Sequence, residues 1–263
     1  MGRALARAGF LLAALAAGCA ELHPADEGEA DAGARAADDA DGGVQPQSDA
    51  GASGDASVDE RPPEQDAGPP PPEEIVTVLG AGNMVDTYVR LANPTFNYGV
   101  TTNFCADTTG DDRRILMRFD VSDVGAATVK KATLRLWTGT SVNDYSTQLY
   151  TAYEMLEAWS EGTQSAAAGV ASWNQRSTNT AWKTAGAGLG SRDDAAIGSF
   201  TPAVIDSEYT VEIDPAVVNG WVADAASNFG IVILSAGADG ACFYSSEHAT
   251  VAKRPSLTVV WTE

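Results

Sequence analysis

The stretch 20–74 most constrains how this chain can fold, because it carries almost nothing that could form a core. It has no aromatic residue and holds 16 acidic residues against only Arg35 and Arg61. Low hydrophobicity with high net charge leaves too little apolar surface to offset the entropy of ordering the chain. We therefore expect residues 20–74 to be a disordered acidic tether, the alternative being a linker that only adds solubility. Folded structure is then confined to residues 75–263.

Residues 1–19 have the features of a secretory signal. Arg3 and Arg7 precede a short apolar run that ends at Cys19, and this run is too short to be a permanent membrane span. The ending is similar to a bacterial lipoprotein signal, in which the cysteine is lipidated and becomes the new N-terminus. We expect lipidation at Cys19, membrane attachment through that lipid, and an outer-membrane or cell-surface location. The alternative is an ordinary signal peptide cut near Ala17 and a secreted protein.

The remaining region, 75–263, is long enough for one domain with a substantial core. Its two cysteines, Cys105 and Cys242, would lie in an oxidising compartment. A disulfide between them is the default expectation, and two separate buried thiols are the alternative. The region is acidic and has no basic run, which argues against nucleic acid as a partner. We expect it to be a monomer.

The pattern inside 75–263 is that of an all-β domain. Segments that alternate, or that are rich in β-branched and aromatic residues, are separated by Gly, Asn, Asp or Pro. They predict strands at 75–79, 85–90, 115–120, 132–138, 148–153, 209–213, 230–235, 242–245 and 256–261. One helix is expected at 215–223, with Asp214 as its N-cap and Pro215 in its first turn. Many short strands with polar connections favour a two-sheet β-sandwich.

Several segments of this domain resemble the DNRLRE domain family. They are Asp86-Thr87-Tyr88-Val89-Arg90, Asn97-Tyr98-Gly99, the runs 113–122 and 132–136, Trp159-Ser160-Glu161, Ser172-Trp173-Asn174, and the runs 219–222, 228–231 and 243–247. Together they span about 84–261. The resemblance implies a jelly-roll-like β-sandwich that serves as a non-catalytic polysaccharide-binding module in secreted bacterial and archaeal proteins. Acidic polysaccharides such as alginate are among the ligands it implies.

Alternation along three of the predicted strands gathers arginines and aromatic rings on one side. If the strands share a sheet, its outer face carries Tyr88, Arg90, Arg114, Arg118, Arg135 and Trp137. Aromatic rings stack on sugars and arginine forks bind carboxylates, so this face is a candidate ligand site for an acidic glycan. The alternative is internal pairing, in which Asp86 and Asp120 neutralise the arginines across strands.

The other tryptophans differ in their sequence context. Trp159, Trp173 and Trp221 are expected in the core. Trp182 lies in a polar run, so we expect it to be exposed and include it among the ligand-binding candidates. An adhesive surface protein that contacts another protein is the rival to polysaccharide binding.

Metal and catalytic signals are modest. Hard oxygen ligands of the kind calcium takes occur at Asp107, Asp111, Asp112, Asp193 and Asp194, without EF-hand spacing. No cofactor is required, and a structural calcium stands beside the alternative of a hydrated turn. The domain's single histidine, His248, lacks a nucleophile-elbow partner and is expected in a loop beside the last strand. We therefore expect the protein not to be an enzyme.

Overall fold

The computed structural model describes residues 68–263, with the exception of 109 and 126–127. The expected signal peptide, the lipidation at Cys19 and residues 20–67 of the expected tether lie outside the described residues. Residues 68–74 carry no regular secondary structure before the first strand. Within the part of the chain that is described, no helix is long and apolar enough to cross a membrane.

One layer of the fold is an antiparallel sheet of four strands. Its order is β1 (Ile75–Leu79), β15 (Ser256–Thr262), β6 (Thr128–Trp137) and β12 (Glu208–Ile213). Strand alternation turns Leu134 and Leu136 of β6 inward, as expected, and leaves Arg135 and Trp137 on the outer side. Trp137 is the last residue of β6 and lies opposite Glu208.

The second layer is an antiparallel sheet of five strands. Its order is β11 (Arg192–Phe200), β7 (Tyr150–Met155), β13 (Ile231–Ser235), β5 (Arg113–Phe119) and β2 (Met84–Arg90). Both faces of this sheet are buried, because consecutive residues of β5, Ile115, Leu116 and Met117, are all fully shielded from solvent. A strand buried on both faces needs cover on both sides, and two separate clusters of apolar side chains provide it.

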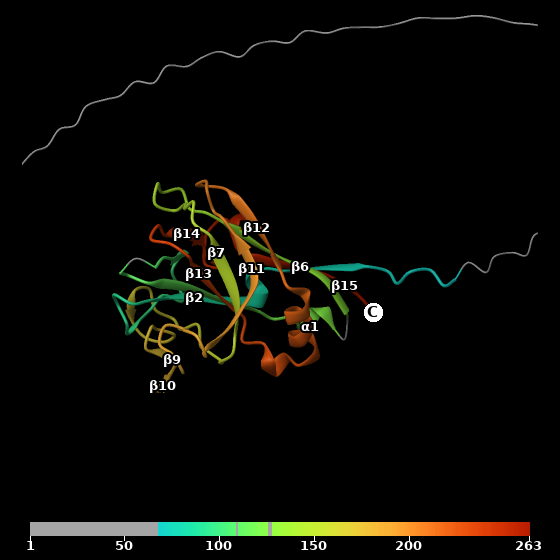
Figure 1. Cartoon of the computed structure of the whole chain (residues 1–263), viewed down its shortest axis with the longest axis horizontal. Helices are drawn as coiled ribbons and strands as arrows, with labels where there is room; N and C mark the ends of the chain where they lie inside the picture. Colours follow the sequence, from blue (N-terminus) through green and yellow to red (C-terminus); the bar gives the residue numbers. More distant parts are fainter. Residues whose placement is uncertain (1–67, 109, 126–127) are drawn as a thin grey trace, which may run out of the picture. The chain divides into compact units, whose positions relative to one another are not determined.

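The main core lies between the two sheets. It combines Leu134 and Leu136 of β6 with Ile115 and Met117 of β5, and it includes Trp221 of the helix α1 (Pro215–Ala223). The helix begins as the sequence predicts, because the Asp214 side chain accepts a hydrogen bond of 2.8 Å from Ala216 N and Pro215 follows it directly. The helix lies beside the start of β6, where Asn219 of α1 is hydrogen-bonded to the backbone of Val129 (Figure 1).

A second core lies on the other face of the five-stranded sheet, under the segment 156–191. This segment contains the short strands β8 (Ala167–Ala168), β9 (Gln175–Ser177) and β10 (Thr180–Ala181), and the β9–β10 hairpin is at the lower left of Figure 1. Its tryptophans Trp159, Trp173 and Trp182 pack with Leu116 and Val232. The expected burial of Trp159 and Trp173, and that of Trp221 in the main core, is confirmed.

The expectation that Trp182 is exposed is wrong. Its side chain is only 5% exposed, and its indole N–H donates to Ser172 O at 2.8 Å. The ring packs in the second core beside Trp173 and Leu116, and removing its apolar surface from water favours this position.

A two-stranded ribbon carries the disulfide. Its strands are β4 (Asn103–Ala106) and β14 (Ala241–Tyr244), which place Cys105 directly opposite Cys242. The two cysteines are joined, so the expected disulfide is present and links residues 137 positions apart. The remaining elements are β3 (Phe96–Asn97), which pairs with β8, and the 3₁₀ turns η1 (Ala81–Asn83), η2 (Ser122–Val124), η3 (Ala225–Ser227) and η4 (Val251–Lys253).

Candidate functional site

The arginines and rings expected on one exposed face do not share a face. Strands β2 and β5 belong to the five-stranded sheet, whereas β6 belongs to the four-stranded sheet. In the β2–β5 pair, Tyr88 lies opposite Ile115 and therefore points toward the main core. Arg114 and Arg118 point to the opposite side, toward the second core. The premise of a single sheet is wrong, and with it the expected continuous face.

Arg90 is paired within the protein, but not with the expected partner. Its guanidinium contacts Asp111 at 2.5 Å, and Arg113 binds the same carboxylate at 2.9 Å. These two arginines, Arg90 first, lower the pKa of Asp111 to about 2. Tyr88 stacks on Tyr98 with ring centroids 4.1 Å apart.

Arg114 and Arg118 lie against the tryptophans of the second core. The Arg114 guanidinium lies 4.8 Å from the centre of the Trp173 ring and donates to Gly186 O at 2.8 Å. Arg118 lies 5.8 Å from the centre of the Trp159 ring. Ligand binding by these arginines stays a prediction, and each already has a partner inside the fold.

Arg135 and Trp137 are the two expected residues that the structure brings to one surface. There Trp137 is joined by Tyr244, His248 and Lys253, and we call these four residues the aromatic patch. The Lys253 ammonium lies 4.9 Å from the centre of the Trp137 ring and 5.7 Å from that of Tyr244. His248 stacks on Tyr244 with centroids 3.7 Å apart and planes inclined by 22°. All four side chains are partly exposed.

Three segments meet to form the aromatic patch. Trp137 ends β6, Tyr244 ends β14, and an isolated bridge between Thr138 and Phe243 ties these two strand ends together. His248 follows in the turn after β14, in a loop as expected, and its Nδ1 accepts from Thr250 N at 3.2 Å. Lys253 comes from η4.

Arg135 holds the loop that carries Lys253. Its guanidinium donates to Ala252 O at 2.9 Å, to Arg254 O at 3.1 Å and to Ser256 Oγ at 3.1 Å. These acceptors use most of its donors. Arg135 therefore positions the patch, and the expectation that it faces a ligand directly stays a prediction.

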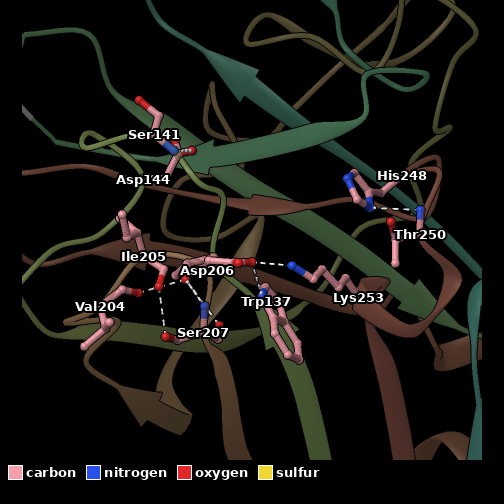
Figure 2. A network of polar contacts seen from close by, with 11 residues as sticks. Trp137, Ser141, Asp144, Val204, Ile205, Asp206, Ser207, His248, Thr250 and Lys253 are labelled. Carbon is pink, nitrogen blue, oxygen red and sulfur yellow. Dashed lines mark hydrogen bonds and ion pairs between the residues drawn. The ribbon is translucent and has the colours of Figure 1, made fainter.

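Asp206 completes the surroundings of the patch. Figure 2 shows its carboxylate between Trp137 and Lys253: Oδ1 accepts from the Trp137 indole N–H at 3.0 Å and from the Lys253 ammonium. The hydrogen bond from Lys253, followed by that from Trp137, lowers the pKa of Asp206. The buried Thr138 fixes this loop, because its hydroxyl donates to Val204 O at 2.8 Å. The patch and the adjoining Asp206 thus offer rings, one ammonium and one carboxylate within a small area.

A second polar feature, which we call the acid cluster, consists of Asp86, Glu161 and Glu247. One carboxylate oxygen from each lies within 4.8 Å of the other two. Asp86 comes from β2, Glu161 from the segment 156–191, and Glu247 from the turn after β14. The backbone N–H of Asp86 donates to Glu161 Oε1 at 2.8 Å, and Ser246 N donates to Asp86 Oδ2 at 2.8 Å.

Burial and the charges of neighbouring carboxylates raise pKa values in this cluster. Burial raises the pKa of Asp86 to about 8, and the charge of Glu247 adds to the rise. Burial also raises the pKa of Glu161. Carboxylate oxygens this close to one another are the ligand type that hard divalent cations take.

The aspartates expected as calcium ligands lie elsewhere. Asp111 is paired with two arginines, and Asp112 lies 3.5 Å from Arg114. Asp193 accepts from the backbone N–H of Ala195 at 2.9 Å. Calcium binding at these aspartates stays a prediction.

Sequence reasoning missed most of both features. Tyr244 alternates with the buried Phe243, which is a signal that it points outward, but its approach to Trp137 depends on a pairing between distant strands. The acids Asp86, Glu161 and Glu247 all occur in segments that resemble the DNRLRE family. Only the folded chain shows that these three segments converge.

Comparison with known families adds one finding. Residues 83–165 match the model of carbohydrate-binding module family 96. The matched part runs from β2 past β7 and includes Trp137, Asp86 and Glu161. No curated protein matches the chain. The DNRLRE resemblance itself stays a prediction. Over residues 83–165 the chain is similar to a family of carbohydrate-binding modules, a function class that does not require catalysis.

Proposed function

We propose that this protein binds a polysaccharide through the aromatic patch, without catalysing its conversion. The observation that carries the proposal is the meeting of Trp137, Tyr244 and His248 with Lys253 on one partly exposed surface. The match of residues 83–165 to a carbohydrate-binding module family supports it, since Trp137 lies inside the matched part.

The chemistry of the patch suits a sugar chain. Aromatic rings present flat apolar surface to the C–H faces of sugar rings. Lys253 donates hydrogen bonds and Asp206 accepts them, so sugar hydroxyl groups can be held from both sides. Both groups sit on ordered backbone, because Thr138 and Arg135 fix the two loops that carry them.

The charge of the patch bears on the type of glycan. Lys253 is the basic residue of the patch, and Asp206 neutralises part of its charge. An acidic glycan such as alginate would compete with Asp206 for Lys253, whereas a neutral glycan would use both groups. We therefore propose that neutral chains are bound at least as well as uronate chains.

The test is retardation of the full chain in native gels that contain alginate or a neutral β-glucan. Trp137→Ala is expected to lose retardation in the polysaccharide that binds. Trp261→Ala is the matched control: it removes a partly buried indole from β15, bonded to Thr77 at 3.0 Å. Equal retardation of Trp137→Ala and wild type would reject the patch as the binding surface.

The same gels address the adhesive alternative. A protein that contacts only another protein would migrate freely in every polysaccharide tested. Retardation of wild type in any of them, lost in Trp137→Ala, would reject that alternative.

We also propose that the chain is exported and lipid-anchored at Cys19, on an acidic tether. The support is in the sequence: the apolar run that ends at Cys19 and the acid-rich stretch 20–74. A palmitate analogue should label wild type and not Cys19→Ser. Equal labelling of both would contradict lipidation at this residue.

A further inference from the structure

The acid cluster has no cationic partner that matches its charge. In the described part of the chain, none of the ion pairs involves Asp86, Glu161 or Glu247. The charge of Arg118 reaches Glu161, but its guanidinium lies near the Trp159 ring. If all three carboxylates, which lie within 4.8 Å of one another and include one that is 1% exposed, were ionised, they would repel strongly in a medium that screens poorly.

A second observation concerns one oxygen of the cluster. Glu247 Oε2 is shielded from solvent and has no hydrogen-bond partner among the residues that the structure describes, although Oε1 of the same side chain accepts from Ser246 Oγ at 2.9 Å. A buried oxygen without a partner costs free energy, so native structures rarely leave one unmatched. The unpaired atom belongs to the side chain that completes the group of three acids.

A proton and a metal ion would reduce the repulsion among the three carboxylates in different ways. A proton joins two oxygens at a time and leaves the third carboxylate with its charge. A cation placed between the three carboxylates contacts all of them and neutralises most of their charge.

The donor set distinguishes among cations. All three side-chain ligands are carboxylates, with neither imidazole nor thiolate among them, and hard oxygen sets favour Ca²⁺ or Mg²⁺ over zinc or copper. Mg²⁺ usually keeps several waters and is held by one or two carboxylates, whereas Ca²⁺ takes about six to eight oxygens in a flexible geometry. A group of three carboxylates, with one oxygen of each within 4.8 Å of the other two, therefore favours Ca²⁺.

We propose that Asp86, Glu161 and Glu247 form a calcium site that ties β2, the segment 156–191 and the turn after β14 together. The site lies apart from the aspartates at which the sequence predicted calcium. It is also adjacent in sequence to His248, so a bound ion would hold the turn from which one ring of the aromatic patch projects.

The experiment is calorimetric titration of the EDTA-treated full chain with CaCl₂. Wild type is expected to bind one Ca²⁺ at a site that Glu247→Gln weakens at least tenfold. Because residues 20–74 hold 16 acids that can attract cations, the matched control is Glu212→Gln. Glu212 is an exposed acid of β12 paired with Lys131 at 3.1 Å, so its loss changes the net charge equally and should leave the site intact.

A second measurement does not depend on how well the variant folds. Tb³⁺ bound at the acid cluster would receive excitation from Trp159, two positions from Glu161, and excess Ca²⁺ should abolish that emission. The proposal is overturned if wild type gives neither calcium heat nor Ca²⁺-sensitive emission. It is also overturned if Glu247→Gln folds and binds as tightly as wild type, or if Mg²⁺ binds more tightly than Ca²⁺.

The outcome for this site is separable from that for the aromatic patch. Glycan retardation of wild type, together with absent calcium binding, would refute the calcium site and leave the proposed function standing. Calcium binding without glycan retardation in any polysaccharide would support the calcium site and refute the proposed function.

Discussion

Trp137 and Trp159 each lie beside a basic side chain, but the two regions differ in what covers them. Trp159 is 4% exposed, with its indole N–H bonded to Phe229 O at 2.8 Å and Arg118 nearby. Trp137 is partly exposed, and its indole bonds to Asp206, a surface carboxylate shared with Lys253. An aromatic ring next to a cation is therefore not by itself a mark of a ligand site. The segment 156–191, which contains Trp159, buries that ring in the second core. Trp137 lies outside this core and stays partly exposed.

The largest expected effect separates the two regions by stability. Trp159→Ala should lower the free energy of unfolding by about 3–5 kcal/mol, because it leaves a cavity in the second core. Trp137→Ala should lower it by about 1 kcal/mol or less, because the ring is partly solvated already. Urea unfolding followed by circular dichroism measures both. Comparable losses in the two variants would mean that Trp137 is a core residue like Trp159.

The next effect concerns what holds the open region in place. Tyr244 ends the ribbon strand that carries Cys242, so the disulfide anchors the aromatic patch. The double variant Cys105→Ser with Cys242→Ser should lose about 2–4 kcal/mol of stability. It should also bind polysaccharide more weakly, since Tyr244 and His248 are then less fixed. Mapping of non-reduced peptides in wild type should find the two cysteines linked, and full glycan affinity in the double variant would show that the patch does not need this anchor.

Substitutions of Arg118 and Lys253 should affect different properties, namely stability for Arg118 and glycan binding for Lys253. Arg118→Ala should cost about 1 kcal/mol of stability, in the range of a partly buried cation–π contact, and leave glycan binding unchanged. Lys253→Ala should leave stability nearly unchanged and weaken glycan binding several-fold. Melting curves run beside binding curves test both variants. A loss of glycan binding in Arg118→Ala at unchanged stability would indicate that Arg118, a residue of the ligand face predicted from sequence, contacts the glycan.

The smallest expected effect is a pH dependence of glycan affinity that comes from Asp206. Its pKa is lowered below the ordinary 3.8, chiefly by the hydrogen bond from Lys253, so the carboxylate stays charged through the neutral range. A group with a depressed folded-state pKa contributes above its unfolded pKa and loses that contribution as the pH falls. The part of the affinity for a neutral glycan that Asp206 contributes should therefore be constant above the ordinary carboxyl range and decline as the pH falls through it. The decline should be absent in Asp206→Asn, which should be weaker at every pH.

Much of the fold follows from local sequence pattern. The helix at 215–223 is present with the predicted bounds, and each of the nine predicted strands is present with ends that differ by a few residues. The missed strands have poor local signals. β11 carries Arg192, two aspartates and Gly198, and its pairing with β7 is interrupted by two register shifts. β4 has only four residues and is defined by the strand across from it.

The candidate site is harder to predict from the sequence than the secondary structure is. Alternation shows which residues share a face of one strand, and it placed Arg135 and Trp137 outward correctly. It does not show which strands share a sheet, so the predicted face combines residues of β2 and β5 with those of β6. It also does not show that a loop such as 156–191 covers a sheet face, so alternation and local polarity predict Arg114 and Trp182 at the surface.

We propose that sugar contacts Trp137 and not the three tryptophans of the segment 156–191. Each of the six tryptophans gives one indole N–H signal in an ¹⁵N-correlated NMR spectrum, and Trp137→Ala identifies the signal in question. A titration with oligosaccharides released from the retarding polysaccharide should shift the Trp137 signal progressively and leave those of Trp159, Trp173 and Trp182 in place. A Trp137 signal that stays fixed while a signal from the second core moves would contradict sugar binding at the aromatic patch.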